Sequence, residues 1–365
     1  MTGGAPVIEN VTTGVYCFPT PAPEADGTLS WESTTAVTVQ VSAGGETGLG
    51  WTYSAGAAAG LVNDKLITVL HARDPLDVAG AWTAMHRACR NLGTKGLAMQ
   101  AVSAVDVALW DLKARLFGRP LGELFGATRG QVPVYGSGGF TTSNDDQLAE
   151  QVDGWRAAGC SGMKIKIGQS WGSDVVRDLH RVRQLRALAG ANVELMVDAN
   201  GGYSPGQARR VGAALDELGV TWFEEPISSD DTSGLGLLRQ ALRCDIAAGE
   251  YVSDIYDAAR LAPVVDCLQL DATRCGGYTG WLRCAAVAAA HNLQVSAHCA
   301  PALHIPVAAT VPNLRHLEYF IDHVRLEPLL LQGVPEARDG VLHVNTTAPG
   351  HGMTLNPAAE EHVVN

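Results

Sequence analysis

Short β-rich segments alternate with helical segments over the last two thirds of the chain, and this alternation constrains the fold more than any other feature. Eight strand candidates follow Gly130: VPVYG, MKIKI, ELMVD, VTWFEE, DIAAGE, CLQLD, LQVSAH and LRHLEYF. Between them, residues 145–158, 173–188, 205–218 and 278–291 carry apolar or small residues at helical spacing. Eight strand–helix repeats predict a closed parallel barrel, with a doubly wound open sheet as the alternative.

The N-terminal part has a different pattern. Residues 34–42 alternate as a strand, the turn AGGETG follows, and LGWTY resumes, which predicts a hairpin. Residues 19–31 are rich in proline and acidic residues and predict a loop. Residues 78–90 and 97–117 have helical spacing. We therefore expect a small α+β domain at residues 1–127 and a barrel at residues 128–325.

The tail lacks a convincing helical pattern after the eighth strand. Pro328, Pro335 and Gly340 interrupt it, and the short strand VLHV at 341–344 indicates that the tail folds back on the first domain. Residues 326–365 are therefore predicted to return to that domain as a C-terminal segment.

Charge and cysteine content exclude several classes of partner. A formal net charge of −12 argues against nucleic acid and anionic lipid, which both need a positive surface. The eight cysteines form no C-x-x-C pair, so they predict free thiols in a reducing compartment. The opening MTGGAPVIENV lacks a signal-peptide pattern, and CAAVAAA at 284–290 is too short for a membrane span. We expect a cytoplasmic protein, and also a homo-oligomer, with no membrane or nucleic-acid partner.

Ionisable residues stand at the carboxyl ends of seven consecutive strand candidates. Successive strand ends are 20 to 34 residues apart, which is the length of a strand–helix unit. The residues are Lys164 and Lys166, Asp198, Glu224, Glu250, Asp271, His298 and Glu318. Because such ends converge on one mouth of a closed parallel barrel, we predict an active site there.

Lys164 and Lys166 lie two residues apart, so their side chains leave the same face of the strand. Repulsion between two ammonium groups and partial burial both lower the pKa of a lysine, as a general base at neutral pH requires. The alternative is an exposed edge strand with two solvated lysines, which a strand covered on both faces disfavours.

Asp198, Glu224 and Glu250 end three successive strands and are predicted neighbours. Three close carboxylates cannot all stay ionised without a cation, and oxygen ligands suit Mg²⁺ better than Zn²⁺. An ion pair with an arginine is the alternative for each of them. Glu225 points the opposite way by strand alternation and is interpreted as a structural partner.

Asp271 and His298 end neighbouring strands and can touch. A carboxylate bonded to one ring nitrogen leaves the other free as a base or acid, although a purely structural pair is the alternative. Glu318 would donate to a substrate carboxylate if protonated, or pair with a lysine. A metal-bound carboxylate would then present its α-carbon between a lysine and a histidine, and the metal and Lys164 would offset the charge of the enediolate.

Seven short motifs carry a resemblance to a known family. They are K-I-K at 164–166, V-D-A-N at 197–200, F-E-E-P at 223–226, A-G-E at 248–250, L-D-A-T-R-C-G-G at 270–277, S-A-H at 296–298 and L-E-Y at 317–319. Together they resemble the mandelate racemase subgroup of the enolase superfamily, and residues 101–126 are similar to the helix that joins its two domains. The resemblance implies an α/β fold: a modified TIM barrel, (β/α)7β, with an N-terminal α+β capping domain completed by the C-terminal tail.

The resemblance also implies a role for each residue at the mouth. The Mg²⁺ ligands would be Asp198, Glu224 and Glu250. The acid/base groups would be Lys166 and the dyad of His298 and Asp271. Lys164 and Glu318 would contact the substrate carboxylate.

Capping-domain loops select the substrate in this family. On these loops the candidate substrate contacts are Glu24, Asp26, Trp31 and Tyr53. Asn200, after a barrel strand, is a further candidate. Polar groups with few aromatics fit a polyol better than a phenyl ring.

The sequence therefore predicts Mg²⁺-dependent removal of the proton α to the carboxylate of a small molecule, through an enediolate. The resemblance makes dehydration of an aldonate or aldarate to a 2-keto-3-deoxy acid the leading interpretation, because family members with this pairing of acid/base groups are mostly sugar-acid dehydratases. A racemase, an epimerase or a lactone cycloisomerase would use the same bases. A silent sugar-acid-binding protein would have lost one of the roles, and a zinc hydrolase would need more histidines at the strand ends.

Overall fold

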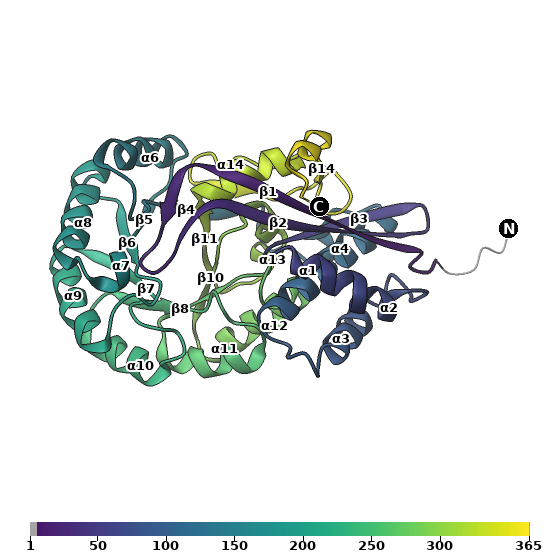
Figure 1. Ribbon diagram of the computed structural model, residues 1–365, viewed down its shortest axis with the longest axis horizontal. Coiled ribbons are helices and arrows are strands. Elements are labelled where there is room, and N and C mark those ends of the chain that lie inside the picture. Colours follow the sequence, from purple (N-terminus) through teal and green to yellow (C-terminus); the bar gives the residue numbers. More distant parts are fainter. Residues whose placement is uncertain (1–5, 365) are drawn as a thin grey trace.

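The computed structural model describes residues 6–364, which form a barrel and a capping domain beside it (Figure 1). Residues 1–5, which begin the segment searched for a signal peptide, and residue 365 lie outside the described residues. None of the helices in the described part is long and apolar enough to cross a membrane. The domain boundaries at residues 127 and 325 stay predictions.

Eight parallel strands form the barrel, and each overlaps one predicted candidate. They are β4 (Gln131–Gly138), β5 (Gly162–Lys166), β6 (Glu194–Asp198), β7 (Val220–Glu224), β8 (Asp245–Ala248), β9 (Cys267–Leu270), β10 (Gln294–Ala297) and β11 (Leu314–Phe320). They pair in chain order, and β11 closes on β4 with Leu317 opposite Val134. The closed barrel is therefore confirmed, and the open sheet is excluded.

Seven helical connections cover the outside of the barrel (Figure 1). Their helices are α6 (Asp145–Ala157), α7 (Gln169–Gly172), α8 (Val175–Ala189), α9 (Pro205–Glu217), α10 (Thr232–Ala241), α11 (Ile255–Leu261), η2 (Ala262–Val264), α12 (Gly277–Ala290) and α13 (Pro301–Ala308). Inside the barrel, Met196 and Trp222 belong to a separate buried apolar cluster. Each precedes a carboxylate by two residues on its strand, so this cluster forms an apolar floor beneath the polar strand ends.

The capping domain packs helices against a three-stranded antiparallel sheet. The strands are β1 (Asn10–Ala25), β2 (Ser30–Ala43) and β3 (Glu46–Tyr53), and the helices are α1 (Ala57–Leu61), η1 (Val62–Leu66), α2 (Ile67–Leu70), α3 (Val78–Ala88), α4 (Leu97–Leu116) and α5 (Leu121–Phe125). Gly50 on β3 allows close contact with α4, because a Cβ atom there would lie 2.1 Å from the Ala104 carbonyl oxygen.

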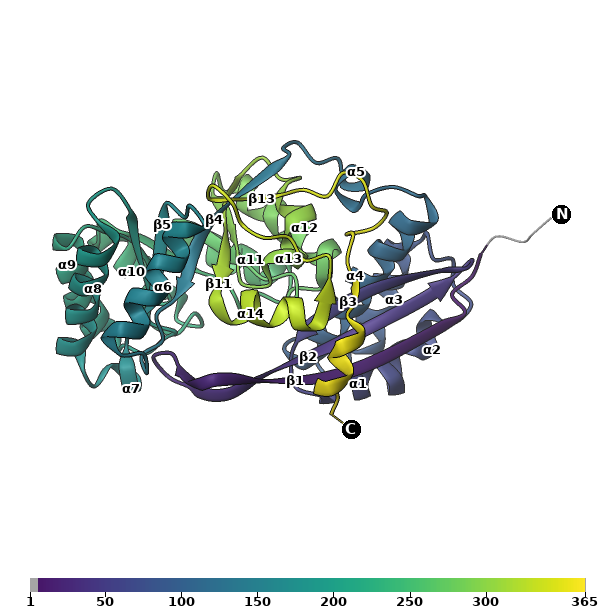
Figure 2. The ribbon, with the colours of Figure 1, turned by 90° about the horizontal axis from the view of Figure 1, so that it is seen from above.

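Residues 19–31, predicted as a loop, instead contain the end of β1, a short turn and the start of β2. They form the far end of a β-ribbon that reaches from the capping domain along the barrel (Figure 2). The prolines are tolerated because β1 is an edge strand and its register shifts between Pro19 and Glu24. At the tip, Gly27 accepts from the Trp171 backbone N–H at 2.9 Å. A Cβ atom on Gly27 would lie 2.5 Å from the Ala199 carbonyl oxygen, so glycine lets the tip dock on the barrel.

The tail departs from its prediction in two ways. A helix, α14 (Ile321–Leu330), follows the eighth strand and packs against β4 and β11. Strand β13 (Val341–His343), expected on the first domain, pairs with barrel strand β4. After strands β12 (Leu331–Gln332) and β14 (Thr354–Leu355) and the short helix η3 (Pro357–His362), the chain does return to the capping domain, where the Val364 N–H donates to the Val15 carbonyl at 2.9 Å. All eight cysteines are free thiols.

Candidate active site

The predicted ionisable residues lie together at the carboxyl-end mouth of the barrel. Each is at most 5% exposed. Asp198 is the register partner of both Lys166 and Glu224, which places strands β5, β6 and β7 in step at the mouth. A cavity of about 400 Å³ opens above them, lined on the barrel side by Lys166, Asn200, Glu250, Asp271 and His298 and on the capping side by residues such as Trp31 and Tyr53.

Asp198, Glu224 and Glu250 form a compact group of oxygen donors. One carboxylate oxygen from each lies within 4.8 Å of the others, and all three side chains are buried. Within residues 6–364, Oε2 of Glu250 finds no hydrogen-bond partner. Burial raises the pKa of Glu224 to about 8, with Asp198 adding to this rise and Lys164 opposing it. An oxygen-only group with an unsatisfied buried atom fits a hard cation such as Mg²⁺.

The two lysines are held by carboxylates on neighbouring strands. Lys164 Nζ lies 2.7 Å from both oxygens of Glu224 and 2.8 Å from Oε1 of Glu318, and Lys166 Nζ pairs with Asp198. Burial lowers the pKa of each lysine, but these carboxylates outweigh burial and raise the pKa above its ordinary value. The pKa is therefore raised, opposite to the predicted lowering, for as long as Asp198 and Glu224 pair with the lysines rather than with a cation.

His298 and Asp271 form the expected dyad. Nδ1 of His298 lies 2.9 Å from Oδ2 of Asp271, and Nε2 lies 3.5 Å from Oε2 of Glu250. Burial lowers the pKa of His298, but Glu250 and Asp271 more than compensate, so the pKa is raised. Lys166 is on β5, and His298 follows β10. Around the closed barrel, four strands lie between β5 and β10 in one direction and two in the other, so the two residues enter the mouth from separate strands.

Glu318 pairs with a lysine, the second of the two roles expected for it. Its Oε1 accepts from Ser137 Oγ at 2.6 Å and pairs with Lys164, while Oε2 accepts from the Cys299 N–H at 2.9 Å. Burial raises the pKa of Glu318, but Lys164 and His298 outweigh it and hold the pKa well below its usual range. Glu318 is thus a lysine-paired carboxylate, and its use as a protonated donor is not supported.

Residues 11–126 match the family described as mandelate racemase / muconate lactonizing enzyme, N-terminal domain, and residues 147–359 match the enolase C-terminal domain-like family. The chain belongs to the mandelate racemase and muconate lactonizing enzyme family.

Several members of this family are similar over most of the chain. The L-talarate/galactarate dehydratase of Salmonella typhimurium is 34% identical over 86% of this chain and 78% of its own length. The 3,6-anhydro-alpha-L-galactonate cycloisomerase of Streptomyces coelicolor is 33% identical over 96% of this chain and 97% of its own. The structure of a mandelate racemase/muconate lactonizing enzyme-like protein from Rubrobacter xylanophilus is 43% identical, with a TM-score of 0.95, and the match covers 98% of this chain and 100% of that one. The Salmonella dehydratase has been solved with Mg and L-lyxarohydroxamate, with a TM-score of 0.91 and 29% identity over 99% of this chain and 94% of that one.

Arg274 was given no role from the sequence. In this protein it lies between the carboxylate trio and the dyad of His298 and Asp271. Arg274 Nη1 lies 2.9 Å from Oε1 of Glu250, and Nε lies 3.5 Å from Oδ2 of Asp271. Its guanidinium also lies 5.0 Å from the ring centre of Tyr251. The signal was available in the D-A-T-R-C-G-G motif, because Arg274 follows Asp271 by three residues in the turn after β9.

Glu225 does not follow the expected strand alternation. Its φ of 36° turns the chain at the end of β7, and its side chain is buried. Burial, then the charges of Glu250 and Asp198, raise its pKa well above the usual range. Its Oε1 has no hydrogen-bond partner in the described chain, and the interpretation of Glu225 as a structural partner rather than a metal ligand stays a prediction.

The candidate substrate contacts divide between two hollows. Trp31, Tyr53, Asp26 and Asn200 line the mouth cavity, and Asn200 leaves Oδ1 unpaired within the described residues. Glu24 instead lines a neighbouring groove of about 820 Å³.

Glu24 and Tyr53 both connect the capping domain to α14 at the edge of the mouth. Oε2 of Glu24 accepts from Trp31 Nε1 at 3.1 Å, and Oε1 pairs with Arg325 at 2.9 Å. Tyr53 stacks on His323 with ring centres 3.7 Å apart, and its hydroxyl donates to Glu327 at 3.3 Å. Glu24 therefore supports a cavity-lining residue rather than lining the cavity itself.

Proposed function

We propose that this chain is a Mg²⁺-dependent enzyme that removes the proton α to the carboxylate of a sugar acid and expels the β-hydroxyl group. The product is a 2-keto-3-deoxy acid. One observation carries this proposal: a buried trio of carboxylates reaches the mouth cavity through Glu250, and two ionisable groups of different chemistry, Lys166 and His298, line the same cavity. The similarity to a talarate/galactarate dehydratase supports the choice of a sugar acid.

Asp198, Glu224 and Glu250 would hold the Mg²⁺, as their oxygen-only donors and the Glu250 oxygen that accepts no hydrogen bond from the described residues suggest. When bound, this ion supplies positive charge beside the substrate carboxylate. Lys164 adds a second positive charge from its position between Glu224 and Glu318. The solved relative that contains Mg supports the same cofactor for this chain.

Lys166 and His298 would exchange protons with the substrate. Both side chains reach the cavity from well-separated strands, so one can take the α-proton while the other protonates the departing hydroxyl. Asp271 holds Nδ1 of His298 and keeps Nε2 directed at the cavity. The ribbon that carries Trp31 would limit the access of water from the capping side.

The test is incubation of the Mg²⁺-loaded enzyme in D₂O with a panel of aldonic and aldaric acids. We expect a 2-keto acid product that carries solvent deuterium. Deuterium in recovered substrate without keto acid would contradict dehydration and indicate an epimerase. Lys166→Ala and His298→Asn should each abolish turnover, whereas the exposed-site controls Lys65→Ala and His291→Asn should leave it unchanged.

Cycloisomerisation of a sugar-acid derivative is the second candidate, because the Streptomyces cycloisomerase is similar over nearly its whole length. It needs proton transfer but no net loss of water. Isomer formation with lactone or anhydro substrates, without keto acid, would favour this candidate. A cytoplasmic location and a homo-oligomeric assembly stay predictions from the sequence.

A further inference from the structure

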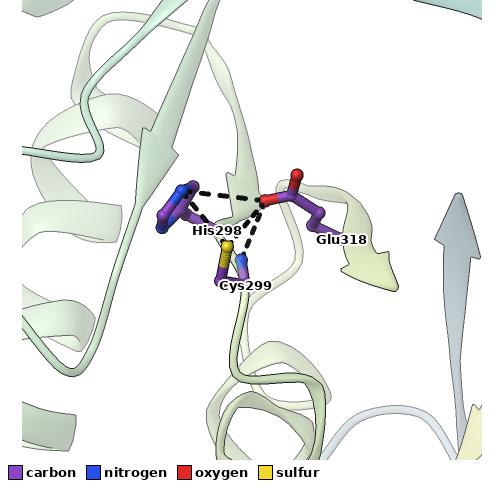
Figure 3. Close-up of side chains that lie close together, drawn as sticks. All are labelled: His298, Cys299 and Glu318. Atoms are coloured by element: carbon purple, nitrogen blue, oxygen red, sulfur yellow. Dashed lines mark hydrogen bonds and ion pairs between the residues drawn. The ribbon is translucent and has the colours of Figure 1, made fainter. Parts of the chain in front are cut away.

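We propose that His298, Cys299 and Glu318 form a second cation site at the mouth, selective for Zn²⁺ or a similarly soft divalent ion. Figure 3 shows the three side chains converging from the end of β10 and from β11. Cys299 Sγ lies 3.3 Å from Nε2 of His298 and 3.5 Å from Oε2 of Glu318. Nε2 of His298 lies 3.9 Å from Oε2 of Glu318. Nitrogen, sulfur and oxygen donors thus face one point.

The spacing of these atoms fits a tetrahedral ion. Zinc bonds of about 2.0 Å to nitrogen or oxygen and about 2.3 Å to sulfur put ligand atoms roughly 3.2–3.6 Å apart. The separations of 3.3 and 3.5 Å from Cys299 Sγ are close to this spacing, and the 3.9 Å between Nε2 of His298 and Oε2 of Glu318 would need to shorten by about 0.6 Å. His298 and Cys299 line the mouth cavity, so a fourth position would be open to water.

Neighbouring groups already orient the three donors. Asp271 holds Nδ1 of His298, so that Nε2, which also lies 3.5 Å from Oε2 of Glu250, is the nitrogen that would bind the ion, the arrangement that usually supports a zinc-bound histidine. Ser137 and Lys164 hold Oε1 of Glu318, which leaves Oε2 directed at Cys299. The donors thus need little reorganisation to bind.

The proposed site differs in chemistry from the carboxylate trio. Asp198, Glu224 and Glu250 offer only hard oxygen donors, whereas a thiolate and an imidazole favour softer ions. On binding, a bond forms between the ion and sulfur while the Cys299 thiol proton passes to solvent.

Occupation would have a direct consequence for the dyad. The ion would use the lone pair on Nε2 of His298, so this nitrogen could no longer accept a proton. Zn²⁺ should therefore inhibit the enzyme even when Mg²⁺ is saturating. The site itself does not depend on the proposed reaction, because it rests on the three donors alone.

The experiment titrates Mg²⁺-saturated protein with Cd²⁺ and records the ultraviolet absorption of the cadmium–thiolate bond, which needs no substrate. We expect a saturable band in the wild type. Cys299→Ser should remove it and weaken Zn²⁺ binding, measured against a chromophoric chelator, by at least about tenfold. Cys299→Ala serves the same purpose should the serine variant not fold.

Two further variants locate the ion. Cys17→Ser, on β1, is the matched thiol control and should keep the band. Asp198→Asn removes a carboxylate of the trio and should also keep it. A band that survives in the Cys299 variants, or unchanged Zn²⁺ affinity in them, would overturn the proposal. In an active preparation, Zn²⁺ should inhibit deuterium exchange in the wild type and the Cys17 variant but much less in the Cys299 variants.

Discussion

Oδ2 of Asp271 lies 2.9 Å from Nδ1 of His298, and both side chains are buried at the mouth. Asp271 therefore fixes which ring nitrogen carries a proton when His298 is neutral. Its other oxygen accepts from the Thr273 N–H at 2.7 Å, so the carboxylate is itself held in place. The acid/base behaviour of His298 depends on this partner.

Asp271→Asn should lower kcat by about 10²- to 10⁴-fold, because an amide no longer stabilises the protonated imidazole or selects the same tautomer. KM should change little, since Asp271 does not need to contact the substrate for this role. Steady-state kinetics with saturating Mg²⁺ measure both. The exposed-site variant Asp64→Asn is the control. A kcat within about threefold of wild type would show that the dyad is only structural.

Mg²⁺ should raise the thermal stability of the protein, because three buried carboxylates repel one another without it. At about 100 times its dissociation constant, a ligand specific for the folded state adds roughly 2.7 kcal/mol. Differential scanning fluorimetry in EDTA and in Mg²⁺ should show a higher Tm with the ion. The shift should vanish in Asp198→Asn, compared with that variant's own EDTA sample. An unchanged wild-type Tm would argue against the trio as a Mg²⁺ site.

The barrel was predictable because each strand is a short apolar run between helical segments, and this pattern depends on local sequence. The ribbon was not, because the prolines of residues 19–23 indicate a loop unless the edge position of β1 is known. Helix α14 was not predicted, for a different reason. Three of its five buried residues, Asp322, His323 and Glu327, are polar, so its buried face does not look apolar.

The positions of the site residues follow from the barrel, since strand ends share one mouth. Their charge states do not follow, because they depend on which groups meet across strands. Lys164 has Glu224 and Glu318 as neighbours, and neither is near it in sequence. The same holds for Arg274, whose partner Glu250 lies on a different strand end.

The ion pair between Arg325 and Glu24 should keep the ribbon positioned over the mouth. Glu24 is 6% exposed and also holds Trp31, a cavity-lining residue. Arg325→Met leaves this buried carboxylate without its charged partner, at a cost of roughly 1–2 kcal/mol. We expect KM to rise several-fold with a smaller change in kcat.

A double substitution makes this prediction sharper. Glu24→Gln in the Arg325→Met background should recover part of the lost affinity, because it removes the unpaired charge. Arg338→Met, at a side chain that is 78% exposed, is the control. Strictly additive effects of the two substitutions on KM would show that the pair does not act as a unit.

Glu327 should make stability fall as pH rises. Burial raises its pKa from 4.5 to about 8, despite hydrogen bonds from the Ala302 N–H and Tyr53 that oppose the rise. Between these two values the unfolded chain has released a proton that the folded protein keeps. Protons therefore favour the folded state there, and the contribution of Glu327 to the free energy of unfolding decreases by up to about 1.4 kcal/mol per pH unit, until the folded group also ionises.

Glu327→Gln removes this titration, so the variant should gain stability relative to the wild type as pH increases from about 5 to about 9. Chemical denaturation at constant Mg²⁺ and ionic strength gives the difference in unfolding free energy at each pH. Glu361→Gln, at an exposed position in η3, is the matched control. Its difference in unfolding free energy from the wild type should not increase over this pH range. A constant difference between Glu327→Gln and the wild type would mean that Glu327 ionises alike in the folded and unfolded chain. Tyr53 would then donate its hydrogen bond to an ionised Glu327 at neutral pH. The edge of the mouth would carry one more negative charge than it does with Glu327 protonated.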